Sequence, residues 1–529
     1  MPTSAFEYEV TRQTLLILVP ELLLLVAATV MMTAGPFVRL PRRAWCAAGA
    51  LALVAALVAL FALHDRTTDL YTAVALNDAF SFWARVVFVL SGLVLLALAH
   101  DQVDDARAAE FFGTFLMIDA GSMLVAAANE MVFLFVGLEL VSIPTYLLLY
   151  LPRRNASTQE AATKYFFLSI FSSGLMLFGL TYLYGLTGIT NLKALAYLAH
   201  SVPNVVPQPQ LALIAIVFIM AGLGFRVAAV PFHFYAPDVY QGSPTVVAAT
   251  LAWIPKAIGF LAIVRTLTAI VAAAGPDSPL GNKAVMIAWI MAVITMTLGN
   301  TVALTQENLK RLLAYSSIAH AGYLLIGVVV AFRNEPGVEG RYLYLGTEGM
   351  LFYLVAYALM TLGAFGVIVL LSSPERTVET VDDLAGLGRT RPAAAVAMAV
   401  CLFSLAGIPP FAGFWGKFEL FASAFSASHG RDARIFQWLA IIGVLTSAVG
   451  AYYYLRIVVV MYLRPAPTKA PLASRPGWPT VAAVAACAGL SVILGLFPAP
   501  VAHAARRAAA AAVAQPDPIP EAVAVERAR

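Results

Sequence analysis

Charged residues that could form ion pairs or exchange protons lie deep inside long apolar segments of this sequence. The basic ones are Arg226, Lys256 and Lys417, and the acidic ones are Glu139 and Asp119. A charge at the centre of a membrane helix costs at least about 2.5–3.5 kcal/mol, so such residues are functional by default. Burial disfavours the charged forms of Lys and Glu, so these groups can exchange protons. One hypothesis is therefore a proton path, and the other is that the acids and bases form neutralising structural pairs.

Histidines add groups that titrate near physiological pH. His233 follows Val230-Pro231-Phe232, and His320 lies inside an apolar segment. Each is either part of a proton path or a hydrogen-bonded core residue, and the sequence leaves both interpretations open. Three arginines near the ends of apolar segments are predicted to be structural, because long side chains there can extend to the membrane surface; they are Arg85, Arg265 and Arg456.

The elements that must position these residues are membrane helices. The chain has 529 residues, of which 61% are hydrophobic and 12% charged. Its apolar residues form blocks of about 20, the length that crosses a hydrocarbon core of about 30 Å, and the alternation of a barrel strand is absent. We therefore expect an all-α polytopic membrane protein with about fourteen transmembrane helices, at 13–34, 44–63, 80–100, 111–127, 131–151, 163–186, 210–231, 245–270, 284–305, 311–332, 349–371, 393–427, 436–462 and 477–497.

Prolines are predicted to break the seventh and twelfth spans, at Pro231 and at Pro409-Pro410. Interrupted helices at matching positions are typical of inverted repeats in transporters. The two breaks are five spans apart, so we predict two inverted five-helix repeats, helices 4–8 and 9–13; ordinary proline kinks are the alternative. The expected units are helices 1–3 (1–110), the first repeat (111–275), the second repeat (276–465), and a last helix with a flexible tail after Pro498 (466–529).

No motif for a metal, a nucleotide or a nucleic acid is present. Cys46, Cys401 and Cys487 lie singly in apolar blocks, and no glycine-rich phosphate loop occurs. We therefore expect no metal or cofactor site in this chain. Lys and Arg are more frequent in the loops after odd-numbered spans, which predicts that both termini lie outside the cytoplasm.

Five motifs together resemble the antiporter-like subunits of respiratory complex I, over about residues 111–460. Within that family, Lys417 in place of Glu is more similar to subunit N than to subunit M, and the lack of a long C-terminal amphipathic helix argues against subunit L. The motifs are Leu138-Glu139-Leu140-Val141-Ser142-Ile143-Pro144, Glu160-Ala161-Ala162-Thr163-Lys164-Tyr165-Phe166, Val230-Pro231-Phe232-His233 with Ala236-Pro237-Asp238-Val239-Tyr240-Gln241-Gly242, the segment from Asn308-Leu309-Lys310-Arg311 to Ala319-His320, and Leu405-Ala406-Gly407-Ile408-Pro409-Pro410 to Lys417-Phe418.

The resemblance implies roles for the buried charges. Glu139 would modulate its basic partner in the seventh span, Lys256 would connect the central axis, and Lys417 would exchange protons with the far side of the membrane. The other expected path residues are Arg226, His233 and His320, and the further candidates are Asp119, Lys164 and Lys310.

The resemblance also implies a setting. The chain would be a proton-translocating subunit of NADH:quinone oxidoreductase in a bacterial plasma (inner) membrane, with both termini periplasmic, and an enzyme only as part of that complex. NADH, flavin, iron–sulfur clusters and quinone would belong to partner subunits. Its partners would be other membrane-arm subunits and the lipid bilayer, with no nucleic acid.

One residue departs from the family pattern. The family has Lys before Val-Pro-Phe-His in the seventh span, whereas this chain has Phe225-Arg226. A guanidinium does not lose its proton in a protein, so Arg226 is predicted to be a fixed charge and not a carrier. Asp119 stands where a small or apolar residue is expected, and the two departures could be linked.

Other functions share parts of this pattern. A subunit of a multi-subunit cation/proton antiporter, or of a membrane-bound hydrogenase, would have the same fold. A secondary solute transporter would use the broken helices to hold substrate, and an inert scaffold would not need deep lysines. The motif combination favours the complex I subunit over all of these.

Overall fold

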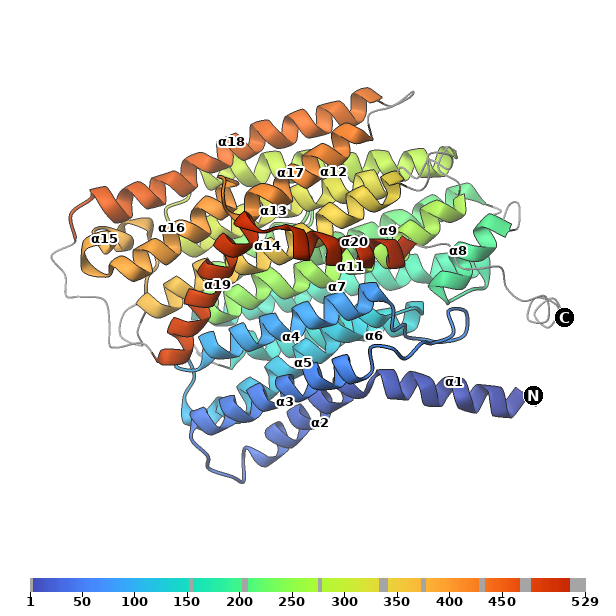
Figure 1. The fold of residues 1–529 in the computed structure, drawn as a ribbon, viewed down its shortest axis with the longest axis horizontal. Coiled ribbons are helices and arrows are strands. Elements are labelled where there is room, and N and C mark those ends of the chain that lie inside the picture. Colours follow the sequence, from blue (N-terminus) through green and yellow to red (C-terminus); the bar gives the residue numbers. More distant parts are fainter. Residues whose placement is uncertain are drawn as a thin grey trace.

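A bundle of long helices makes up the computed structural model (Figure 1). It describes residues 3–151, 156–201, 208–274, 278–332, 341–372, 377–427, 433–466 and 477–513, and no β-strand occurs among them. In these ranges twelve helices are long and apolar enough to cross a membrane, or thirteen if one bent pair counts as a span. Each of the predicted spans coincides with helical residues, but 13–34 is bent and 393–427 is divided between two 15-residue helices.

The N-terminal helices differ from the prediction at their start. Helix α1 already begins at Thr3, and a 61° bend at Leu18 separates it from α2. Pro20 lies in the first turn of α2, where a missing backbone N–H costs nothing. The helices of this unit are α1 (Thr3–Ile17), α2 (Val19–Ala34), α3 (Arg42–Ala62) and α4 (Ala79–Ala99).

The next seven helices cover the expected first repeat. Among them α9 ends at Val227, followed by Ala228 in the left-handed conformation (φ 57°), and helical structure resumes eight residues later in α10. They are α5 (Ala108–Ala127), α6 (Met131–Tyr150), α7 (Ala156–Thr187), α8 (Leu192–Ser201), α9 (Pro209–Val227), α10 (Tyr235–Gly242) and α11 (Thr245–Ala274).

The expected second repeat has a similar interruption. Helix α16 ends at Ala406 and is followed by Gly407, also left-handed (φ 83°). In both places a proline follows the left-handed residue by three positions, Pro231 after Ala228 and Pro410 after Gly407. The helices here are α12 (Pro279–Ala303), α13 (Leu309–Phe332), α14 (Arg341–Leu371), α15 (Leu387–Thr390), α16 (Pro392–Ala406), α17 (Ala412–Ser426) and α18 (Ala433–Leu463).

Helices α11 and α13 form the centre of the bundle. The apolar window of α11 is 100% buried and that of α13 is 94% buried, whereas only 28% of the α18 window is buried. Helices that are apolar on all sides belong in such a core. Small residues let α12 and α13 approach closely, since a Cβ on Gly322 would lie 2.5 Å from the backbone nitrogen of Met296.

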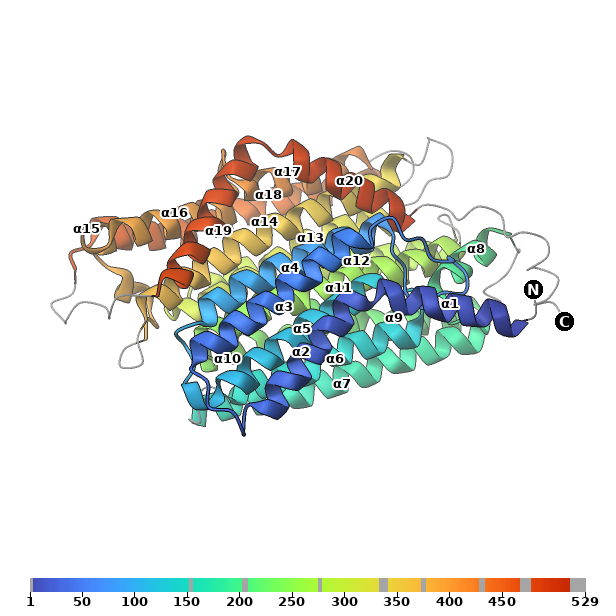
Figure 2. The same ribbon diagram turned by 60° about the horizontal axis from the view of Figure 1, so that its bottom comes forward.

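The prediction of a flexible tail directly after Pro498 was wrong for its first part. Residues Ala499–Val513 form a helix, α20, that follows α19 (Trp478–Leu496) and packs against α4 and α14. Alanine is the best helix former and supplies most of this segment. Residues 514–529, also predicted as tail, lie outside the described residues. The start of α1 and the end of α20 lie at the same end of the bundle in both orientations shown (Figures 1 and 2).

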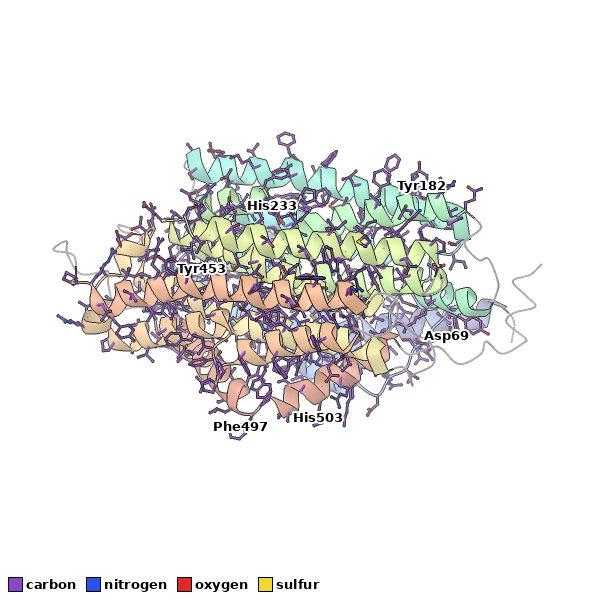
Figure 3. All side chains as sticks on the ribbon, turned by 90° about the horizontal axis from the view of Figure 1, so that it is seen from above. Asp69, Tyr182, His233, Tyr453, Phe497 and His503 are labelled. Carbon is purple, nitrogen blue, oxygen red and sulfur yellow. The ribbon has the colours of Figure 1, made fainter. Side chains whose placement is uncertain are left out.

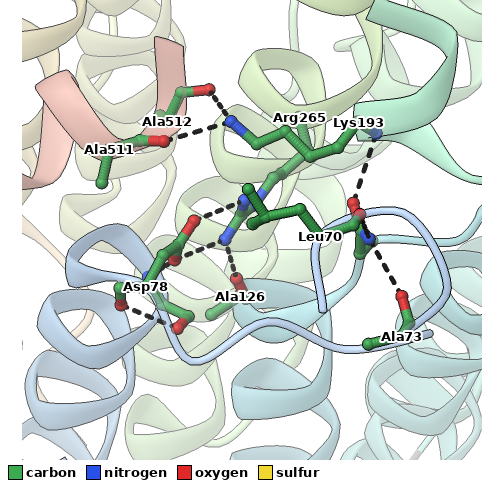
Figure 4. A network of polar contacts seen from close by, with 10 residues as sticks. Leu70, Ala73, Asp78, Ala126, Lys193, Arg265, Ala511 and Ala512 are labelled. Carbon is green, nitrogen blue, oxygen red and sulfur yellow. Dashed lines mark hydrogen bonds and ion pairs between the residues drawn. The ribbon is translucent and has the colours of Figure 1, made fainter. Parts of the chain in front are cut away.

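A polar network fixes the end of α20 (Figure 4). Lys193 Nζ on α8 donates to the carbonyl oxygens of Ala511 and Ala512, at 3.2 and 3.1 Å, where a helix end leaves acceptors without intrahelical partners. Next to it, the Arg265 guanidinium donates to both carboxylate oxygens of Asp78 at 2.9 Å. Burial acts to raise the pKa of Asp78, but attraction to Arg265 and hydrogen bonds lower it overall. The network joins α8, α11, the start of α4 and the C-terminal helix.

Candidate proton pathway

Arg226 and Glu139 form an ion pair between α9 and α6. Arg226 Nη2 lies 2.8 Å from Glu139 Oε1, and Arg226 is only 4% exposed. Ser173 on α7 completes the pair, because its hydroxyl donates to Glu139 Oε1 (2.5 Å) and accepts from Arg226 Nη2 (3.2 Å). Arg226 Nη1 also donates to Ser142 Oγ and to the carbonyl oxygen of Leu138. Side chains and a carbonyl oxygen of two helices, α6 and α7, thus hold the guanidinium as a desolvated, hydrogen-bonded cation.

Lys256 lies at the centre of α11 and is 1% exposed. Its Nζ contacts the backbone oxygen of Ser317 on α13 and lies 2.6 Å from the hydroxyl of the same residue. The Tyr357 hydroxyl also donates to Ser317 Oγ, at 2.7 Å, and its ring lies 5.5 Å from the amine. These partners are uncharged, so Lys256 can release a proton without leaving a carboxylate unpaired.

His320 is one turn further along α13 and is 1% exposed. Its Nδ1 shares a hydrogen bond with the Tyr353 hydroxyl on α14, and its Nε2 lies 3.0 Å from the Tyr454 hydroxyl on α18. Tyr454 also shares a hydrogen bond with Ser316 Oγ. A neutral imidazole offers one donor and one acceptor, and both are used here.

Lys417 on α17 binds the end of the preceding helix. Its Nζ donates to the carbonyl oxygens of Leu405 and Ala406, at 2.9 and 3.0 Å, and to Ser447 Oγ on α18 at 2.9 Å. The last carbonyls of α16 have no intrahelical partner, and they attract a cation. A Cβ at Gly407 would lie 2.9 Å from Lys417 Cδ, so glycine there serves both the left-handed turn and the lysine. Lys417 also lies 5.0 Å above the ring of Tyr323.

The predicted residues fall into separate groups. Among the described contacts only Glu139 and Arg226 touch directly. Gly259, three residues after Lys256 on α11, packs against Val227 and Arg226 of α9, whereas the Lys256 amine contacts Ser317 of α13. Among the described contacts, His320 meets neither Lys256 nor Lys417 directly; its hydrogen bonds are with the hydroxyls of Tyr353 and Tyr454.

Other candidates lie apart from this axis. Asp119 is 3% exposed and packs against Gly92 of α4, where a Cβ would lie 1.9 Å from its Oδ2. No contact between Asp119 and Arg226 is present among the described residues, so the two departures are not linked by touching. His233 lies in the turn between α9 and α10 (Figure 3), and its Nδ1 has no hydrogen-bond partner in the described part of the chain.

Lys164 and Lys310 both bind the α10 region, Lys164 at Asp238 and Lys310 at Ser243. Lys164 Nζ lies 2.8 Å from Asp238, and Lys310 Nζ donates to the Ser243 carbonyl oxygen at 2.7 Å. Arg311 binds the second oxygen of Asp238 at 2.6 Å. This cluster joins α7, α10 and α13 at the opposite end of α11 from Arg265.

Two features of the structure were not predicted from the sequence. Arg85, predicted to reach the membrane surface, is 0% exposed and pairs at 2.8 Å with Glu21 of α2, for which no role was predicted. Arg265 and Arg456 likewise bind protein groups, Asp78 and the carbonyl oxygens after α12. The second feature is the set of hydroxyls around His320. Ser316 and Ser317 stand in a quoted motif, but the tyrosines are far away in sequence, so only the fold brings them there.

Known proteins resemble this chain over almost its full length. The family model described as NADH:quinone oxidoreductase/Mrp antiporter, TM, matches residues 128–450. NADH-quinone oxidoreductase subunit N of Trichlorobacter lovleyi is 38% identical over 93% of this chain and 96% of its own. The subunit of the same name from Myxococcus xanthus is 37% identical over 92% and 95%.

Solved structures are similar as well. A chain of respiratory complex I from Thermus thermophilus with bound aureothin has a TM-score of 0.74 at 32% identity, covering 92% of this chain and 98% of that chain. A chain of the Mrp complex from Dietzia sp. has a TM-score of 0.79 at 20% identity, covering 95% of this chain and 98% of that chain, which is a likeness of fold alone.

Proposed function

Because this chain belongs to the NADH:quinone oxidoreductase/Mrp antiporter family, and within it to NADH-quinone oxidoreductase subunit N, we propose that its buried charged residues are the path by which this membrane-arm subunit moves protons. Lys256, His320 and Lys417 carry the proton in turn. Arg226 stays charged and, with Glu139, sets the field in which Lys256 gains or loses its proton.

The observation that carries this proposal is the burial of three cations with a single carboxylate contact among them. Arg226, Lys256 and Lys417 are 4%, 1% and 5% exposed, and within the described ranges only Arg226 of these three binds a carboxylate. A purely structural design would pair each charge, since a buried unpaired ion is costly. Lysines held by hydroxyls and carbonyl oxygens are instead suited to reversible protonation.

The interrupted regions after α9 and α16 support a repeated architecture of helices 4–8 and 9–13 with a broken seventh and twelfth span. The supporting features are the left-handed residue that closes each helix and the proline three residues later. In this arrangement Lys417 lies at the end of α16, where the orphan carbonyls give a proton carrier a polar site within the membrane.

The membrane is a bacterial inner membrane in this proposal, with the ends of α1 and α20 on the periplasmic side. Redox chemistry on NADH and quinone, with its flavin and iron–sulfur cofactors, takes place in partner subunits. The energy of quinone reduction reaches this chain through the other membrane-arm subunits it contacts.

The test is Lys417→Met in the assembled complex, in sealed vesicles. Met keeps the approximate shape but cannot carry a proton, so coupled proton transfer should be lost. Moving one charge against 100 mV costs about 2.3 kcal/mol, so a blocked path should also slow quinone reduction. Lys283→Met, at an exposed position on α12, is the matched control and should leave both activities unchanged. Wild-type coupling in assembled Lys417→Met would overturn the proposal.

A further inference from the structure

Two adjacent tyrosines of α18 turn inward from a largely exposed helix. Tyr453 and Tyr454 are each 1% exposed, and Figure 3 shows Tyr453 on this outer helix. Both hydroxyls lie in the core, close to each other and to Ser316, but their short hydrogen bonds go to different groups. The Tyr454 hydroxyl lies between Ser316 Oγ and His320 Nε2, and the Tyr453 hydroxyl donates to Asn300 Oδ1 at 3.1 Å.

The hydrogen bonds around Tyr454 are reversible in direction. A hydroxyl has one proton, so Tyr454 either donates to His320 Nε2 and accepts from Ser316, or accepts from His320 and donates to Ser316. Every group in the chain Ser316–Tyr454–His320–Tyr353 can act as both donor and acceptor. Its hydrogen bonds can therefore all reverse together when the imidazole changes tautomer.

The hydrogen bonds around Tyr453 cannot reverse. Asn300 Nδ2 donates to the Met296 carbonyl oxygen and to the Tyr323 hydroxyl, both at 2.8 Å, and a backbone carbonyl only accepts. This fixes the Asn300 amide and leaves its Oδ1 to accept from Tyr453. Two neighbouring, equally buried tyrosines thus differ in whether their hydroxyl can pass a proton on.

The hydrogen-bonded series Ser316–Tyr454–His320–Tyr353 starts at the residue that precedes Ser317, to which Lys256 binds. Lys256 and Tyr357 bind Ser317, and the next residue back along α13, Ser316, binds Tyr454. The two groups therefore share one turn of the central helix. Tyr454 is the residue that connects this turn to His320 Nε2.

We propose that Tyr454 relays protons between the Ser316–Ser317 turn and His320, so that α18 supplies a working group of the path. This rests on the proposed function of the buried axis. When Ser316 Oγ takes up a proton, its own proton passes to the Tyr454 oxygen, and the Tyr454 proton passes to His320 Nε2. His320 then releases its Nδ1 proton to the Tyr353 oxygen as the Tyr353 hydroxyl proton passes to a water molecule, so one proton enters at Ser316, one leaves at Tyr353, and each group ends with the number of protons it had.

The experiment compares Tyr454→Phe with Tyr453→Phe in the assembled complex in sealed vesicles. Loss of a positioned proton donor should lower the coupled rate of Tyr454→Phe at least about tenfold and change its pH profile. Tyr453→Phe removes an equally buried hydroxyl and should lower thermal stability, while the coupled rate per assembled complex and its pH profile stay as in the wild type.

A second substitution covers the case in which Tyr454→Phe does not assemble. Tyr454→3,5-difluorotyrosine keeps the hydroxyl and the ring but makes the phenol more acidic, so the pH profile of the coupled rate should move to lower pH. An unchanged profile in this variant, wild-type coupling in Tyr454→Phe, or an equal change in Tyr453→Phe would each overturn the relay. If Lys417→Met is inactive while Tyr454→Phe is normal, only the relay fails and the proposed path remains.

Discussion

The Arg226 guanidinium lies 2.8 Å from the Glu139 carboxylate, and the Ser173 hydroxyl contacts both. The arginine is almost fully buried, while the side chain of Glu139 is 22% exposed. Both terminal nitrogens of the guanidinium donate to two groups each, so its orientation is fixed from α6 and α7. The residue that carries this permanent cation packs against α11 at Gly259, one turn from Lys256.

Arg226→Lys should therefore keep coupled proton transfer, because a lysine retains the charge that Glu139 needs. Arg226→Met should lower it about tenfold or more, since Glu139 then loses its ion-pair partner and the positive charge near α11 is lost. Proton transfer per quinone reduced is the measurement, in vesicles with equal amounts of assembled complex. The double variant Glu139→Gln with Arg226→Met restores charge balance and should assemble well, yet still translocate poorly. Normal translocation by Arg226→Met would show that the charge is not needed.

Lys256→Arg should abolish coupled proton transfer, whereas Arg226→Lys should keep it. Lys256→Arg keeps a positive charge but cannot release a proton at any physiological pH, so we expect it to abolish coupled transfer as fully as Lys256→Met. The two variants are compared for assembly and for the coupled rate. The core around α11 is tightly packed. Lys256→Met introduces neither a charge nor a larger side chain, so comparison with it separates the effect of the larger arginine side chain from the effect of lost proton release. If Lys256→Arg translocates protons, Lys256 acts as a fixed charge and not as a carrier.

The helical architecture and the burial of Arg226, Lys256 and Lys417 could be predicted from the sequence, because both follow from hydropathy and charge placement. The prediction missed the bend at Leu18, where no glycine or proline stands at the hinge itself, and it missed α20, whose alanines lack the hydropathy of a span. It also misjudged Arg85, because position along a helix does not reveal that Glu21 of another helix faces it. The tyrosines around His320 come from α14 and α18, and contacts over such sequence distances depend on packing alone.

Gly92 should tolerate no side chain while Asp119 is present. A Cβ at this position would lie 1.9 Å from Asp119 Oδ2, so Gly92→Ala should destabilise the protein by about 1–3 kcal/mol through overpacking. Adding Asp119→Ala should recover most of this loss, because it vacates the contact, and the coupling is read from thermal midpoints of the four proteins in a double-mutant cycle.

Asp119→Asn alone should leave coupled proton transfer unchanged, because Asp119 faces α4 and contacts no residue of the proposed path among the described residues. Asparagine keeps the shape of the side chain against Gly92. Strong loss of transfer in assembled Asp119→Asn would instead make Asp119 a proton carrier, as the sequence left open.

Lys193 should make the attachment of α20 depend on pH. Burial, helped by repulsion from Arg265 and opposed by attraction to Asp78, lowers the pKa of Lys193 from 10.5 to about 8. Between these two values the unfolded chain holds a proton that the folded chain has released. The contribution of Lys193 to the free energy of unfolding therefore rises with pH from about 8 to 10.5, and below about pH 8 the fold bears the full cost of the buried ammonium.

Lys193→Met removes the titrating group, so stability of the wild type relative to this variant should increase between pH 8 and pH 10. The thermal midpoint reports the whole protein, and hydrogen exchange of the α20 amides reports the contact with Ala511 and Ala512. Lys283→Met, which alters an exposed lysine, should show no such increase and controls for the general effect of pH. A constant difference between wild type and Lys193→Met over this range would mean that Lys193 keeps its proton in the folded protein. The amine would then hold α20 as a permanent cation at the end of the helix.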